Sequence, residues 1–287
     1  MRTLKPILLL LSCLAVSLAQ AADIVRDVSS GRTDEDVNGG YFELGFSAGY
    51  LDRSFLNNEI AEQNGGFLGL AVGGAYRYKR FFIEASQGTL DGLNTGYTFY
   101  SDQNFEFDFI FSSINGNIDT ELDEADDVLR YGTEADRNEY LLARETLYSG
   151  MGLRATAYYD DYVLQLGLLE DVYDNAGFTS TIRLGRAWLV KNWNFHSIIG
   201  AEYASANTHH YLYGVDQAFA TEMFPEYSPK SGFSLVGEIG TTYPLSKNWV
   251  YRSIVRFRHL SEQIQNSPLT DGGHTDTIFY NSISYVF

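Results

Sequence analysis

Cysteine and proline are both scarce in this sequence. Cys13 is the only cysteine among 287 residues, and only five prolines are present. Because Cys13 lies in the N-terminal apolar segment, the rest of the chain can form neither a disulfide framework nor a thiolate metal site. A chain without further cysteine can also cross an oxidising compartment without being trapped by wrong disulfides.

Positive charge is the second shortage. The sequence holds 20 Lys and Arg against 37 Asp and Glu, a formal charge of −17 at pH 7. Nucleic acid is therefore not an expected partner, because phosphate binding depends on Lys and Arg. Pro/Gly/Ser-rich linkers are also missing, so we expect one domain after the N-terminal segment.

The N-terminus has the pattern of a cleaved signal peptide. Arg2 and Lys5 precede an apolar run from Ile7 to Leu18, and Ala19-Gln20-Ala21 fits the small-x-small rule. The run is too short for a transmembrane helix, which needs roughly twenty residues. The segment around Cys13 loosely resembles a lipobox, but the residues after Cys13 stay apolar as in an uninterrupted signal.

We therefore expect residues 1–21 to be removed, or one residue more. Residues 22–40 are charged and poor in apolar residues, which predicts a disordered segment on the periplasmic side. Without Arg2 and Lys5, 18 basic residues face 37 acidic ones.

Apolar and polar residues alternate along much of the remaining chain. Near the C-terminus, Phe279, Ile283, Tyr285 and Phe287 share one face of a strand. Strands of about ten residues with an apolar face bounded by aromatics are typical of transmembrane barrels. A soluble sandwich would show the same alternation, but its strands are usually five or six residues long.

Short and long connections also alternate, which predicts a topology. The short ones are expected near residues 79–80, 101–104, 160–161, 191–192 and 246–248, and the long ones at 52–65, 90–94, 115–145, 172–176, 206–230 and 262–273. Residues 41–287 are therefore expected to form an all-β, antiparallel, up-and-down transmembrane barrel of about twelve strands. The short fourth strand, near Thr95 to Tyr100, leaves ten strands possible.

The face opposite the apolar one carries charges of both signs. Its members are Glu43, Glu84, Glu106, Asp108, Glu202, Glu238, Arg77, Arg154, Arg183, Arg252, Arg256 and Arg258. Opposite charges can pair across strands and fill a small barrel, and we expect Glu238 to pair with Arg252. A plugged lumen and a narrow selective pore both remain open. Arg186 breaks the pattern by falling on the apolar row.

Several segments in the last eighty residues resemble a known family. They are Tyr211-Leu212-Tyr213-Gly214-Val215, Pro225 to Gly232, Tyr243 to Trp249, and Asn266-Ser267-Pro268-Leu269-Thr270. Their residues and spacing resemble the MipA/OmpV family of outer-membrane proteins. The first half of the chain matches less well, since residues 51–59 and the acidic 115–145 segment depart from the family pattern.

The resemblance implies a non-enzymatic protein of the bacterial outer membrane. One family namesake is described as a scaffold that brings a lytic transglycosylase together with a bifunctional penicillin-binding protein, and other members have adhesive, antigenic or resistance-linked roles. The expected partners are then the membrane with its lipopolysaccharide, the barrel-assembly machinery, which would read the terminal strand ending at Phe287, and possible murein enzymes. A narrow solute channel and a surface adhesin are the alternatives.

An enzymatic alternative depends on His259 and Ser261. Arg258-His259-Leu260-Ser261 resembles a stretch of lipid A deacylases, and a serine activated by an adjacent histidine is a recognised nucleophile. Both side chains are expected on the lipid-facing row, and a third orienting residue is missing. We therefore expect no catalytic residue.

Metal sites are not expected either. The acidic residues Asp119, Glu121, Asp123, Glu124, Asp126 and Asp127 lack the EF-hand offsets. We expect these residues to lie in a solvated loop, and divalent-cation binding by that loop remains open. The adjacent His209 and His210 lack a third ligand and are expected to be exposed in a loop. No cofactor is predicted.

Overall fold

The structure is a computed structural model that describes residues 24, 38–56, 64–87, 92–115, 125–143, 148–172 and 177–287. The elements in chain order are β1 (Gly39–Asp52), β2 (Gly65–Tyr78), β3 (Phe81–Ala85), β4 (Asn94–Ser101), β5 (Phe105–Asn115), α4 (Ala125–Tyr131), α5 (Glu134–Ala143), β6 (Tyr148–Tyr159), β7 (Tyr162–Asp171), β8 (Phe178–Val190), β9 (Trp193–Ala204), α6 (Ala206–Tyr213), β10 (Gly232–Pro244), β11 (Trp249–His259), α7 (Glu262–Gln265) and β12 (Thr275–Val286). The predicted signal peptide, residues 1–21, lies outside the described residues.

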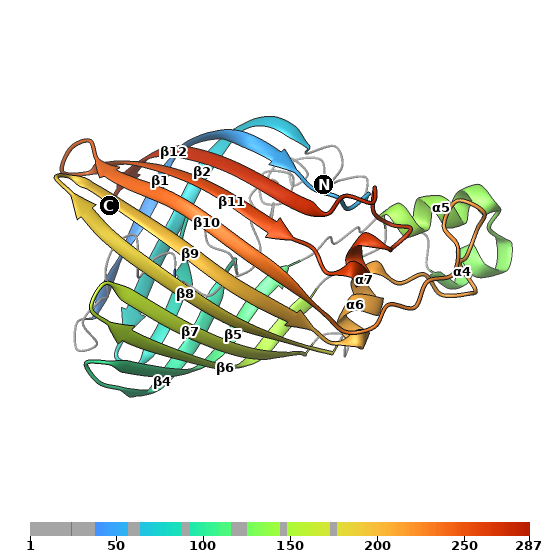
Figure 1. The fold of residues 1–287 in the computed structure, drawn as a ribbon, viewed down its shortest axis with the longest axis horizontal. Helices are drawn as coiled ribbons and strands as arrows, with labels where there is room; N and C mark the ends of the chain where they lie inside the picture. The colour runs from blue at the N-terminus through green and yellow to red at the C-terminus, as the bar shows by residue number, and fades with distance from the viewer. Residues whose placement is uncertain are drawn as a thin grey trace, which may run out of the picture.

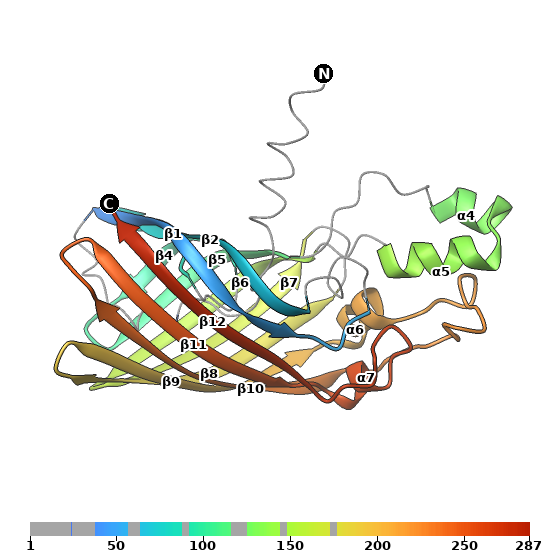
Figure 2. The ribbon, with the colours of Figure 1, turned by 90° about the horizontal axis from the view of Figure 1, so that it is seen from above.

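The strands close into one barrel in which each strand pairs with its neighbour in the sequence (Figures 1 and 2). All neighbours are antiparallel, and β1 pairs with β12 from Glu43↔Val286 to Asp52↔Thr277 to complete the ring. The prediction of a twelve-stranded up-and-down barrel is confirmed, and the ten-stranded alternative is wrong.

Alternation along each strand separates an apolar exterior from a polar interior, as predicted. In β5, Phe105 and Phe109 are exposed on the outside, while Glu106 and Asp108 are buried inside. On β2, Leu68 is 88% exposed. A surface this apolar is stable only against lipid, because an apolar patch of this extent is not found on soluble monomers.

The five short connections lie at one end of the barrel, where Phe287 also lies, and we call it the turn end (Figure 1). Three of them place Lys79, Asp160 and Lys191 at φ values of 55°, 50° and 56°. This left-handed conformation matches the twist of two-residue hairpins. In outer-membrane barrels the short turns are periplasmic and the long loops extracellular.

The opposite end, which we call the loop end, carries all four described helices (Figure 1). The predicted acidic loop is wrong for its second half, because residues 125–143 form α4 and α5. The acidic positions 119–124 lie outside the described residues. Within the described part of the chain, no helix is long and apolar enough to cross a membrane.

Candidate functional site

The lumen is lined by charged side chains of both signs. All twelve predicted positions point inward, and eleven of them are buried, with Arg258 partly exposed. The six carboxylates are matched by six guanidinium groups, so the wall contributes little net charge. Buried charges are stable only when they are paired and hydrogen-bonded, and the structure shows such pairs in two networks.

The first network lies between β2 and β6, and we call it the β2–β6 network; its charged members are Arg77, Glu84, Glu106, Asp108 and Arg154. Arg154 is its centre, since its Nη1 lies 2.5 Å from Glu84 Oε1 and its Nε donates to Asp108 Oδ2 at 2.8 Å. Arg77 Nη2 donates to Glu106 Oε1 at 3.2 Å. Four strands are thus joined through ion pairs.

Two uncharged side chains complete this network. Thr98 of β4 accepts from Arg77 Nη1 at 3.2 Å and donates to Asp108 Oδ1 at 2.6 Å, which adds a fifth strand. The guanidinium groups of Arg77 and Arg154 lie 5.6 and 5.0 Å from the centroid of the Phe82 ring. The buried Phe82 ring therefore makes cation–π contacts with both guanidinium groups. Sequence reasoning missed it, although Phe82 falls on the inward row beside Glu84.

The second network lies between β8 and β11, and we call it the β8–β11 network; its members are Arg183, His196, Glu202, Glu238, Arg256 and Arg258. Glu202 accepts from Arg183 Nη2 and from Arg258 Nε, each at 3.1 Å. Glu238 accepts from Arg256 Nε at 2.6 Å and lies 3.0 Å from His196 Nε2. Each carboxylate is therefore shared by two cationic or potentially cationic groups.

The predicted pairing of Glu238 with Arg252 is wrong. In the β10–β11 register Glu238 lies opposite Arg256, whereas Arg252 lies opposite Thr242. Arg252 instead forms an ion pair with Glu43 on β1, across β12. Arg186, the predicted exception, is on the outer surface with its guanidinium 5.0 Å from the ring centroid of Tyr162.

The family-motif residues meet at the loop end, where they form a cap. Tyr211 and Tyr213 belong to α6, Gly214 and Val215 follow it directly, and Ser267, Pro268 and Leu269 follow α7. Ser267 Oγ donates to the carbonyl of Tyr213 at 2.7 Å and accepts from the amide of Leu269 at 3.1 Å. Two motif segments more than fifty residues apart are therefore joined by one serine hydroxyl.

An apolar cluster holds the cap together. Val215 and Leu269 pack with Phe224 and with Leu141 of α5. Gly214 ends α6 by donating its amide hydrogen to the carbonyl of His210 at 2.8 Å. A Cβ at Gly214 would lie 2.5 Å from His210 Nδ1, so a side chain there would displace the helix end.

Tyr213 connects this cap to the lumen. Its hydroxyl hydrogen-bonds the guanidinium of Arg258, and burial raises the pKa of Tyr213 above its ordinary value. Arg258 in turn donates to Glu202, which also binds Arg183. A continuous chain of polar contacts thus runs from a motif tyrosine in the cap to the middle of the barrel wall.

The predicted placement of His259 and Ser261 on one lipid-facing row is wrong. His259 is exposed at the end of β11, whereas Ser261 is buried as the N-cap of α7 and accepts from the amide of Ile264 at 3.3 Å. Its nearest histidine is His209, with Nε2 3.5 Å from Ser261 Oγ. A serine followed by Glu262 at a strand end is an N-cap signal, which the sequence analysis did not use.

The prediction that His209 and His210 are exposed in a loop is also wrong. Both belong to α6, and His209 is only 2% exposed, with Nδ1 2.7 Å from the carbonyl of Lys230. Burial lowers the pKa of His209 below its ordinary value. His210 lies 3.0 Å from Asp216. Among the residues that the structure describes, no group of three or more His, Cys, Asp or Glu could hold a metal ion.

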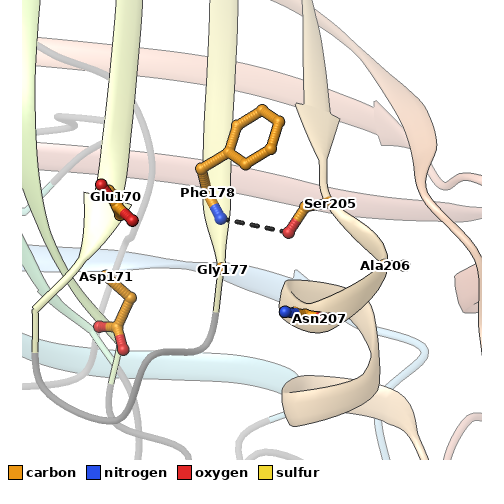
Figure 3. Close-up of a pocket in the computed structure, with 7 residues that line it drawn as sticks. All are labelled: Glu170, Asp171, Gly177, Phe178, Ser205, Ala206 and Asn207. Carbon is orange, nitrogen blue, oxygen red and sulfur yellow. Dashed lines mark hydrogen bonds between the residues drawn. The ribbon is translucent and has the colours of Figure 1, made fainter.

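A cavity of about 400 Å³ opens at the loop end beside the start of α6 (Figure 3). Its described lining residues are Glu170, Asp171, Gly177, Phe178, Ser205, Ala206 and Asn207. Ser205 Oγ accepts from the amide of Phe178 at 3.1 Å and so fixes the entry of α6 against β8. The side chain of Asp171 is buried and accepts from the amide of Ser149 at 3.0 Å, which is a structural role.

The chain was compared with solved structures and with curated proteins. Solved structures with a similar outline include a KdgM porin (12% identity, 85% of this chain and 99% of that chain, TM-score 0.39) and a NanC porin (6% identity, 84% and 98%, TM-score 0.42). Another is a loop-deletion mutant of OmpT, an outer-membrane protein of Vibrio cholerae (8% identity, 88% and 100%, TM-score 0.38). No individually curated protein matches the chain.

The family comparison is specific. A closed barrel of twelve strands with an apolar exterior is the architecture of an outer-membrane protein. The model of the family described as "MltA-interacting protein MipA" matches residues 40–287, which is the barrel except for Gly39. The chain belongs to the MipA family.

Proposed function

We propose that this outer-membrane protein is a non-enzymatic scaffold that binds murein-hydrolysing and murein-synthesising enzymes at its periplasmic end. The observation that carries the proposal is the family match over residues 40–287, because the family description names an interaction with MltA. The partners we expect are a lytic transglycosylase and a penicillin-binding protein.

The packing of the lumen supports a role at the surface rather than in passage. The β2–β6 and β8–β11 networks, with the Arg252–Glu43 pair, line the interior with side chains that bind one another. Removing one partner from such a pair costs several kcal/mol. A solute that displaced these side chains would therefore have to offset a large loss of free energy.

The turn end offers a surface with a defined charge layout. The β4–β5 and β6–β7 turns are neighbours in the barrel and carry the exposed Asp102 and Asp161. The β8–β9 and β10–β11 turns are also neighbours and carry the exposed Lys191 and Lys247. An acidic arc therefore adjoins a basic arc on the periplasmic rim, and such patterns fix the orientation of a protein partner.

The experiment is a crosslinking pull-down from envelopes with three matched variants. In the basic arc, Lys191→Asn removes one positive charge and Lys247→Glu, made in the same protein, reverses the other. In the acidic arc, Asp161→Asn removes one negative charge. Asparagine tolerates the left-handed backbone at position 191. Lys230→Glu makes the same kind of charge change at the loop end and is the control.

The wild type and Lys230→Glu should recover the lytic transglycosylase and the penicillin-binding protein. At least one arc variant should recover roughly tenfold less, the equivalent of about 1.4 kcal/mol. Recovery of only lipopolysaccharide and assembly factors by the wild type would refute the scaffold. Equal recovery by all four proteins would refute the turn end as the contact surface.

A further inference from the structure

An apolar patch lies among the charges of the lumen, on strands β7, β9 and β10. Val163 of β7, Ile198 of β9 and Val236 of β10 are all buried on the inward face. Their inward neighbours along the strands are polar or glycine, including His196 and Glu238. Apolar side chains facing a polar lumen are unfavourable unless something apolar covers them.

The strand register places a glycine within this patch. Val163 lies opposite Gly185 on β8, and Gly185 lies opposite Ile198 on β9. Gly185 faces the lumen and is buried, and it carries no side chain to fill the space between its two neighbours. Along this row, a large side chain on β7 is followed by a glycine on β8 and by a second large side chain on β9.

Ile24 fills the patch. Its side chain is fully buried and packs with Val163, Ile198 and Val236, with Tyr158 and Ala187 beside them. Ile24 precedes the first strand by fifteen residues, and with the cleavage after Ala21 that the sequence predicts, it remains in the exported chain. A residue expected in a free periplasmic segment is thus found inside the barrel.

We propose that Val163, Gly185, Ile198 and Val236 form a docking niche in the lumen that binds the protein's own N-terminal segment through Ile24. The occupant is this chain rather than a solute or a second copy, since Ile24 is already in place and meets the niche on several strands. While Ile24 is bound, the niche is closed to other apolar ligands.

Engineered disulfides test the contact directly, with Cys13→Ser in every variant to remove the only native cysteine. Under mild oxidation Ile24→Cys with Val236→Cys should form an intramolecular disulfide, identified in the digested protein by mass spectrometry. Ile24→Cys with Ser47→Cys is the control, because Ser47 also faces the lumen but lies on β1, three strands from β10. Equal crosslinking of both pairs, or crosslinking between two chains, would overturn the proposal.

A larger side chain at Gly185 tests the niche itself. Gly185→Leu in the Ile24→Cys, Val236→Cys background should slow crosslinking roughly tenfold, because the new side chain occupies the space of Ile24. Gly237→Leu is the matched control, since a Cβ at Gly237 meets nothing within 4 Å. Unchanged crosslinking with Gly185→Leu would overturn the niche.

A second route covers the case in which Gly185→Leu fails to fold. In this route Val236→Cys is labelled with a water-soluble maleimide, with Ile24→Asp or Ile24→Leu in the same chain. Aspartate should be expelled from the apolar patch and should raise the labelling rate roughly tenfold, whereas leucine should not. Equal rates would overturn the proposal. None of these readouts involves a murein enzyme, so they are independent of the scaffold proposal.

Discussion

The two charged networks of the lumen differ in the strength of the wall that surrounds them. The β2–β6 network spans the thinnest part, where β3 has five residues and pairs with β4 through only four register positions. The β8–β11 network is surrounded by long ladders, such as the twelve register positions between β8 and β9. The first network also joins five strands, whereas the second joins four and continues into the cap through Tyr213.

This difference suggests separate tasks for similar ion pairs. Where backbone hydrogen bonds are few, the side chains of the β2–β6 network hold the wall closed. Where backbone bonds are plentiful, the β8–β11 network is free to connect the wall with Tyr213 and with the neighbouring Ile24 niche. Similar ion pairs therefore stabilise the wall on one side of the barrel and connect the wall to the cap on the other side.

The largest expected effect is the loss of Arg154 from the β2–β6 network. Arg154→Met leaves Glu84 and Asp108 buried without their shared cation, which should cost about 3–5 kcal/mol. Urea unfolding in detergent measures the loss, and hydrogen exchange should place it in β3 and β4. Adding Glu84→Gln and Asp108→Asn removes the stranded charges and should restore much of the stability.

Arg256→Met is the matched change in the β8–β11 network. It leaves Glu238 in contact with His196, whose Nε2 lies 3.0 Å from Glu238 Oε1. The loss should be roughly half of that for Arg154→Met, because one carboxylate that keeps a polar partner is stranded instead of two that share a single cation. An equal loss for both variants would show that the two networks do not differ as proposed.

Much of the barrel could be predicted from the sequence because its signals are local. Alternation assigned Phe105 and Glu106 to opposite faces, and the turn residues near Lys79, Asp160 and Lys191 marked three of the hairpins. Both signals depend on one strand or one turn at a time, and a lipid environment enforces them, since an inverted strand would bury charge in hydrocarbon.

Pairings across strands could not be predicted in the same way. Alternation places Glu238 and Arg252 on the inward face, but only the register decides that Glu238 meets Arg256. The partner of Ser261 depends on α6 folding over the loop end, which brings His209 across 52 positions. Ile24 was missed because a charged, apolar-poor segment gives no local signal for docking inside a barrel.

A smaller effect is expected for the contact between the cap and the β8–β11 network. Tyr213→Phe removes the hydroxyl that bonds Arg258, which should destabilise the cap by about 1–2 kcal/mol and leave the barrel ladders intact. Limited proteolysis of residues 206–231 should become faster by about one order of magnitude. Tyr131→Phe is the control, since Tyr131 is 82% exposed on α4. Faster proteolysis of both variants would mean that Tyr213 does not connect the cap specifically.

The smallest expected effect is a pH dependence of the cap through His209. Burial, opposed by the bond to the Lys230 carbonyl and reinforced by Arg258, lowers the pKa of His209 below its ordinary 6.5. Above that ordinary value the ring is neutral in the closed and open cap, so pH has no effect through it. As pH falls below it, the open cap takes up a proton first, and closure is progressively disfavoured until the lowered pKa is passed.

Proteolysis of the loop end between about pH 8 and pH 5 should therefore accelerate modestly on the acid side. His209→Gln should flatten this profile, whereas His259→Gln should keep it, because His259 is exposed on the outer surface. If both variants keep the acid-side acceleration, another group controls the cap. A flat profile for His209→Gln alone would assign the pH response to the β8–β11 side of the molecule, where the network reaches the loop end, and not to the β2–β6 side.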